Sequence, residues 1–80
     1  MEFNLYVKTE KGLYGYKTIA GPDLDAALLD AGMDVGYTKT SPQGGELDYD
    51  VPGVVSLIES DDEYEPEFTA GIVGMEWETV

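Results

Sequence analysis

The sequence predicts an α+β fold, in which an antiparallel β-sheet carries one helix packed on one face, in the order β-β-α-β-β-β-β. Three observations support this prediction. The chain has 80 residues, the size of a single small domain, and no long linker divides residues 1–80. Several segments alternate apolar and polar residues between short turns, as antiparallel strands do. Only one segment clearly repeats its apolar residues at helical spacing.

The first twenty residues predict a β-hairpin. Residues 2–9 place an apolar side chain at every second position, which is the pattern of a half-buried strand. Residues 10–12 form a short turn whose glycine accepts a positive φ. Residues 13–20 are rich in Tyr, Thr and Ile, so they form the returning strand.

A short helix is predicted after Gly21. Pro22 suits the first helical position, and Asp23 in the first turn interacts favourably with the helix dipole. Gly32 is suited to end the helix. Between them, one apolar stripe at helical spacing contains Leu24, Ala27, Leu28 and Ala31. A helix of about ten residues is marginal alone, so it must pack on the sheet.

The middle of the chain predicts further strands. Residues 35–40 form a third strand and residues 41–45 a loop. Residues 46–51 alternate and end at Pro52-Gly53. Residues 54–58 are β-branched and favour a strand, although Val54, Leu57 and Ile58 also fit the spacing of a short helix.

The end of the chain predicts a closing strand. Pro66 places the acidic run 59–67 in a loop or at a sheet edge. Residues 68–80 form a strand or a kinked pair, in which Gly71 and Gly74 mark bulges. On this strand Val73, Met75 and Trp77 face one side, while Glu76 and Glu78 face the other. The predicted core contains Phe3, Leu5, Val7, Ile19, Leu24, Leu28, Leu57 and Trp77.

Charge is distributed unevenly along the chain. Residues 1–40 hold six acidic residues and all four lysines, whereas residues 41–80 hold eleven acidic residues and no basic one. Six of the carboxylates fall in the nine residues 59–67. Like charges at this density repel one another and oppose compaction. The simplest interpretation is a solvated acidic surface, and the asymmetry between the halves favours a surface with a purpose.

The composition also excludes several functions. A net charge of −13 with four basic residues argues against direct binding of nucleic acid or of anionic membranes. The chain lacks His and Cys, so the usual nucleophile–base pairs cannot form, and no glycine-rich phosphate loop is present. We therefore predict a protein that is not an enzyme and needs no cofactor or metal. The absence of a signal peptide or a long apolar stretch favours the cytoplasm.

A calcium-binding loop is one alternative. Residues 48–59 nearly fit an EF-hand loop, with Asp48 and Asp50 at positions one and three and Glu59 at position twelve. Pro52, however, occupies a position where an oxygen ligand belongs. The preceding segment contains one Pro and two Gly, so it cannot form the entering helix. The competing interpretation is an acidic strand, a turn and another strand.

Mimicry of a nucleic-acid backbone is a further interpretation of the acidic surface. Residues on one face of a strand repeat every 6.6–7 Å or so, a pitch broadly similar to that of phosphates along a strand. If extended, Glu59, Asp61, Glu63, Glu65 and Glu67 form one such row, and Glu46, Asp48 and Asp50 form a second. Tyr64 and Tyr49 lie inside these rows, where tyrosines are typical of interface centres, although either could equally belong to the core. The residues predicted to bind a basic partner are Asp61, Asp62, Glu63, Glu65 and Glu67, then Glu46, Asp48 and Asp50, with Tyr64 and Tyr49 between them.

In its small size, strong acidity, lack of cysteine and one-sheet, one-helix layout, the chain resembles the small phage-encoded inhibitors of bacterial defence. It is most similar to anti-CRISPR proteins of the DNA-mimic type. The resemblance covers the whole chain in composition and layout. It implies binding to a basic DNA- or PAM-recognising surface of a CRISPR effector subunit in the bacterial host cytoplasm, which blocks target DNA. An acidic protein-interaction module of other purpose is the alternative.

Overall fold

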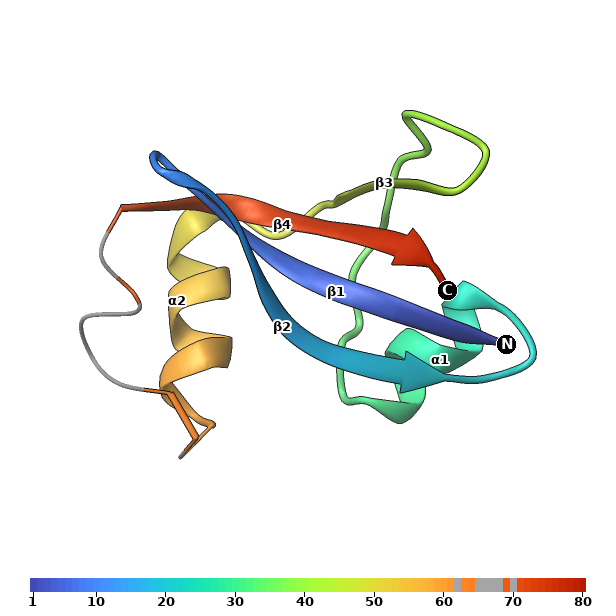
Figure 1. The fold of residues 1–80 in the computed structure, drawn as a ribbon. Coiled ribbons are helices and arrows are strands. Elements are labelled where there is room, and N and C mark those ends of the chain that lie inside the picture. Colours follow the sequence, from blue (N-terminus) through green and yellow to red (C-terminus); the bar gives the residue numbers. More distant parts are fainter. Residues whose placement is uncertain (62, 65–68, 70) are drawn as a thin grey trace.

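The computed structural model contains a four-stranded antiparallel sheet and two helices, and it describes residues 1–61, 63–64, 69 and 71–80 (Figure 1). The elements are β1 (Glu2–Thr9), β2 (Gly12–Ala20), α1 (Leu24–Asp30), β3 (Gly44–Leu47), α2 (Val51–Glu59) and β4 (Ile72–Thr79). The strands lie in the order β2-β1-β4-β3. The predicted α+β class is confirmed.

The predicted hairpin forms the first half of the sheet. Every residue of β1 has a partner on β2, from Glu2 opposite Ala20 to Thr9 opposite Gly12, with one register shift between Leu5 and Tyr6. Gly12 has a φ of 134°, a conformation that L side chains rarely adopt, so the turn depends on this glycine. A bulge makes Tyr16 an extra residue in β2. Tyr16 is turned into the core as a result.

The helix α1 forms where predicted, but it begins at Leu24, two residues after Pro22, and has seven residues. Asp23 is the N-cap residue, and its Oδ1 accepts a hydrogen bond from the Ala26 N–H at 2.8 Å. This bond satisfies one of the amides that have no partner inside a helix. After the C-cap residue Ala31, Gly32 takes a φ of 79°, as expected of a glycine that ends a helix.

The segment after β3 differs from the prediction. Residues 54–58 favoured a strand, and the structure shows the alternative, the helix α2. Asp50 is its N-cap residue and accepts a hydrogen bond from the Gly53 N–H at 2.7 Å. Pro52 lies in the first turn, where a helix needs no N–H. Pro52-Gly53 therefore begins a helix here and does not simply end a strand.

The predicted strand at residues 35–40 is also wrong, because only Tyr37 forms an isolated bridge, to Leu47. The segment nevertheless runs beside β3, where the Thr38 and Glu46 backbones bond to each other in both directions. The Thr38 carbonyl also accepts a bond from the Trp77 indole at 3.0 Å. A Cβ atom on Gly45 would lie 1.7 Å from this carbonyl, so the close approach requires glycine.

β4 lies between β1 and β3 and completes the core. Its buried residues Met75 and Trp77 lie opposite Val7 and Leu5 of β1. A register shift opposite Lys8 and Thr9 confirms a bulge beside Gly74. Because of this bulge, Val73 is exposed and does not share the face of Met75 as predicted. Phe68, which was predicted to begin this strand, lies outside the described residues.

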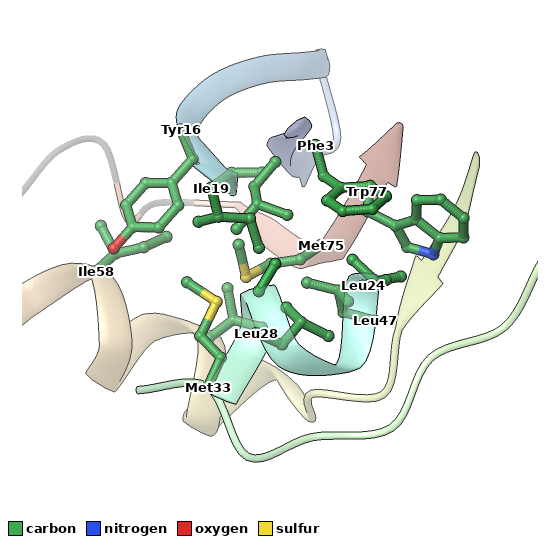
Figure 2. Packing of buried hydrophobic residues seen from close by; sticks show 14 of the residues in the cluster. Phe3, Tyr16, Ile19, Leu24, Leu28, Met33, Leu47, Ile58, Met75 and Trp77 are labelled. Atoms are coloured by element: carbon green, nitrogen blue, oxygen red, sulfur yellow. The ribbon is translucent and has the colours of Figure 1, made fainter. Parts of the chain in front are cut away.

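The core lies between one face of the sheet and both helices (Figure 2). Every predicted core residue is buried except Leu57, which is half-buried against the cluster. Buried residues that were not predicted are Tyr16, Ala27, Met33, Leu47, Val54, Ile58, Ile72 and Met75. Met33 follows α1, and Figure 2 shows its side chain directed into the core beside Leu28. Both helices therefore pack on the same face of the sheet.

Candidate anionic binding surface

The opposite face of the sheet is the candidate site, and we call it the outer face. Because side chains alternate along a strand, residues between the buried positions of β1 and β4 point away from the helices. The outer face carries Glu2, Asn4, Tyr6 and Lys8 of β1, Glu46 of β3, and Glu76 and Glu78 of β4. Among the described residues of β1, β3 and β4, four carboxylates thus share this face with one lysine.

The strand register places two of these carboxylates directly opposite each other. Glu46 of β3 pairs with Glu76 of β4. Glu78 lies two residues further along β4, at roughly 6.6–7 Å on the same face. Like charges opposite each other across a sheet are destabilising. The fold therefore tolerates a local repulsion on this face.

Two interactions of β1 residues hold the carboxylates in place. The Lys8 Nζ atom lies 3.1 Å from Glu46 Oε1. The Tyr6 hydroxyl donates a hydrogen bond to Glu78 Oε2. The hydrogen bond to Glu78 raises the pKa of Tyr6, and the hydrogen bond to Glu46 raises the pKa of Lys8. At neutral pH Tyr6 is thus a donor, Lys8 is charged, and the excess of negative charge remains.

A shallow groove of about 400 Å³ crosses this face. Tyr6 and Leu13 contribute apolar surface to it, and Glu76 and Glu78 contribute carboxylates. Leu13 of β2 is 51% exposed. Among the described residues, Glu76 makes no side-chain hydrogen bond or ion pair. The groove can therefore offer a carboxylate beside an aromatic ring.

The described part of the run 59–67 is tied to β2. Asp61 Oδ2 lies 3.5 Å from the Tyr16 hydroxyl and 3.9 Å from Lys17 Nζ. The Tyr64 hydroxyl donates to the Tyr16 carbonyl, and the two rings pack with centroids 5.0 Å apart. Burial, followed by the charge of Asp61, raises the pKa of Tyr16 to about 12. Asp61 and Tyr64 therefore serve the fold in this structure.

The other predicted binding residues of this run are placed only in part. Glu63 is exposed, and its N–H donates to Asp61 Oδ1 at 3.2 Å. Asp62, Glu65 and Glu67 lie outside the described residues. Of the five carboxylates predicted for an extended row, Glu59 ends the helix α2, Asp61 and Glu63 follow it, and Glu65 and Glu67 lie outside the described residues.

The second predicted row, Glu46, Asp48 and Asp50, is interrupted because β3 ends at Leu47. Glu46 remains on the outer face, whereas Asp50 caps α2. Asp48 is exposed beyond the end of β3. Tyr49 is half-buried and packs against the core, so it does not lie within an exposed acidic row. The row predicted from alternation alone is wrong beyond Leu47.

The near-match to a calcium loop does not have the geometry of one. Residues 51–59 of the expected loop are the helix α2, and the Asp50 carboxylate already accepts a hydrogen bond from Gly53. Within the described part of the chain, no three carboxylates come together as they would to hold a metal ion. A helix that begins at Val51 keeps Glu59 away from Asp48, whereas an EF-hand loop brings these positions to one ion.

In comparisons with protein-family models, curated proteins and solved structures, no match to this chain was found. Across the residues that the structure describes, none of the helices is long and apolar enough to cross a membrane.

The sequence predicts only part of the outer face. The alternation of residues 2–9 places Tyr6 and Lys8 on one face, and that of β4 pairs Glu76 with Glu78. No local signal shows that Glu46 joins them. That contact depends on the strand order, in which the last strand inserts between β1 and β3.

Proposed function

We propose that this protein is a non-enzymatic inhibitor that binds a basic, nucleic-acid-binding surface by DNA mimicry and thereby blocks target DNA. The resemblance to small phage-encoded inhibitors suggests a subunit of a CRISPR effector as the partner. The observation that carries the proposal is the outer face, where Glu2, Glu46, Glu76 and Glu78 share one lysine.

The single lysine leaves this face strongly anionic. Lys8 forms an ion pair with Glu46, and its charge also interacts with Glu76, so one positive charge faces four carboxylates and a net negative charge remains. A second lysine, Lys17 of β2, lies 3.9 Å from Asp61 Oδ2. Charge-assisted hydrogen bonds from partner Lys and Arg side chains would satisfy the remaining carboxylates. A groove built to bind phosphates supplies such side chains.

The spacing of these carboxylates also suits a partner whose groove normally binds a phosphate backbone. Glu76 and Glu78 repeat at the strand pitch along β4, while Glu46 adds a charge across the sheet. Carboxylates spaced on a rigid sheet present charges with no backbone left to order on binding, so only their side chains lose conformational entropy. Rigid spacing therefore favours recognition by a preformed basic groove.

The experiment is a competition for DNA. Purified CRISPR effector complexes are mixed with fluorescent target DNA, and DNA binding is followed by anisotropy as the protein is added. We expect displacement with one protein per DNA site, and an inhibition constant that weakens steeply between 50 and 300 mM salt or so. Ternary complexes that retain the DNA would contradict mimicry, and a lack of binding to any effector would exclude this class of partner.

A charge-reversal pair tests the site originally predicted from sequence. Glu63→Lys with Glu65→Lys weakens competition by about 10-fold or more if the run 59–67 forms part of the surface, because each reversal creates a like-charge clash. Lys8→Glu with Lys11→Glu is the opposite-sign comparison and should not weaken it to that extent. If the Glu63/Glu65 variant competes with DNA as well as the parent does, the run 59–67 is not part of the interface.

A further inference from the structure

We propose that the outer face docks an extended segment of the partner through an arginine side chain, which enters the groove between Glu76 and Glu78 and stacks on the Tyr6 ring. This inference rests on the proposed function and names both the docking face and the partner's chemistry. It moves the centre of the interface from the acidic run 59–67 to the middle of the sheet.

Neither helix of the described chain covers this face. Both helices contribute to the core on the other side, and Figure 1 shows them on the same side of the strands. The residues that line the groove on the outer face include Tyr6, Leu13, Gly44, Glu76, Trp77 and Glu78. Tyr6 and the exposed Leu13 make its apolar surface, and Gly44 adds no side chain that would fill it. An extended chain can therefore lie in the groove.

The positions of the polar groups favour a guanidinium. Tyr6 pairs with Glu76 in the β1–β4 register, while its hydroxyl donates to Glu78. Tyr6 therefore lies opposite Glu76 and is hydrogen-bonded to Glu78, so its ring is next to both carboxylates. A guanidinium is planar, stacks on aromatic faces and binds carboxylates in a bidentate manner. Lysine supplies the charge without this planar fit.

Charge complementarity selects the occupant. The phosphates of a nucleic acid would be repelled by a chain of net charge −13, and a second copy would bring another −13 to the contact. Lys8 is held by Glu46 and does not neutralise Glu76 or Glu78 through an ion pair. A basic segment of another protein is therefore the occupant that this face fits.

The first test uses defined peptides in place of the unidentified partner. A peptide of alternating Arg and Ser, and one of alternating Lys and Ser, are titrated into the ¹⁵N-labelled protein. We expect the largest amide shifts at Tyr6, Glu76 and Glu78, and binding of the arginine peptide at least about 3-fold tighter. Largest shifts at Glu59–Glu63, or equal affinities for the two peptides, would overturn the inference.

Matched variants then test the named residues. Glu76→Gln with Glu78→Gln should weaken arginine-peptide binding by about 10-fold. Asp30→Asn with Asp34→Asn, two exposed residues in and after α1, removes the same charge and should change it less than 2-fold or so. A similar loss in both pairs would show that net charge alone drives binding, and would refute the site.

The role of Tyr6 has its own pair of variants. Tyr6→Phe keeps the ring and should retain the preference for arginine over lysine, while Tyr6→Leu should lose it. The amide spectrum of each variant shows whether the sheet is intact. If Tyr6→Leu is not folded, Tyr6→Phe together with the peptide shifts still decides the matter, because shifts without a preference for arginine would contradict stacking.

The two proposals can fail separately. If the protein displaces DNA from an effector and the Glu76/Glu78 variant does so equally well, the proposed function stands and the docking face is wrong. If the arginine peptide binds the outer face and the protein never displaces DNA, the docking face stands and DNA mimicry is wrong.

Discussion

The two faces of the sheet use the same strands for opposite purposes. One face buries Leu5, Val7 and Met75 against the helices, and the other presents Tyr6, Glu76 and Glu78 to solvent. On the buried face, neighbours attract and each atom removed leaves a cavity. On the outer face, Glu46 and Glu76 repel each other. Removing a group should therefore destabilise one face and stabilise the other.

The largest expected effect tests the buried side of this comparison. Leu28→Ala should lower the free energy of unfolding by about 2–4 kcal/mol, because Leu28 is fully buried in the core. Its neighbour Leu29 is 62% exposed, so Leu29→Ala should change stability by less than about 0.5 kcal/mol. Urea unfolding monitored by circular dichroism measures both. Similar losses would show that α1 does not pack as described.

The next effect concerns alkaline pH. Burial raises the pKa of Tyr16 to about 12, whereas a tyrosine in the unfolded chain titrates near ~10. Between these values the folded state keeps a proton that the unfolded state releases, so stability is complete below about pH 10 and falls as the pH rises toward 12. Tyr16→Phe cannot ionise, and its urea midpoint should fall less over this range. Parallel curves would contradict the shift.

A smaller loss of stability is expected at Asp50, a carboxylate that caps a helix and does not lie on the outer face. Asp50→Ala should destabilise by about 1 kcal/mol, because α2 loses its N-cap hydrogen bond. Asp50→Asn keeps a capping oxygen and should be nearly neutral. Thermal melting of both variants is the measurement. If Asn destabilises as much as Ala, the charge and not the cap is the relevant property.

The smallest effect has the opposite sign. Glu76→Gln should stabilise by about 0.2–1 kcal/mol, because it ends the repulsion from Glu46. The gain should shrink between 10 and 500 mM salt or so, since salt screens exposed charges, and the parent's melting temperature should rise over the same range. Glu46→Gln also ends the repulsion but loses the ion pair with Lys8, so its gain should be smaller. A loss of stability in Glu76→Gln would show that the carboxylate is held by attraction.

Local signals explain why one helix was predictable and the other was not. α1 has an N-cap Asp, an apolar stripe and a terminal Gly in consecutive order. α2 has the same type of cap in Asp50, but the cap lies within a segment that alternates like a strand. Its Val-rich composition then favours β-structure by propensity. Packing of Val54 and Ile58 in the core outweighs that propensity.

The candidate site was harder to predict because it depends on non-local pairing. Tyr6, Glu76 and Glu78 could be assigned to a face by alternation, yet their meeting requires β4 to lie beside β1. The sequence predicts Asp61 as a binding residue, but it does not show the contacts of Asp61 with Tyr16 and Lys17, which are far away in the sequence. Charge density in a sequence thus indicates that an acidic surface exists, and the topology decides which carboxylates form it.

The insertion of β4 between β1 and β3 also bears on how the chain folds. The hairpin of residues 2–20 needs only local contacts, so it can form within microseconds. β1 gains its second neighbour only when residues 72–79 arrive, and the last backbone bond of that pairing joins the Val80 N–H to the Glu2 carbonyl at 3.0 Å. Such distant pairings raise the contact order and slow folding. During synthesis on the ribosome, the β1 edge stays open to other chains until residues 72–79 emerge.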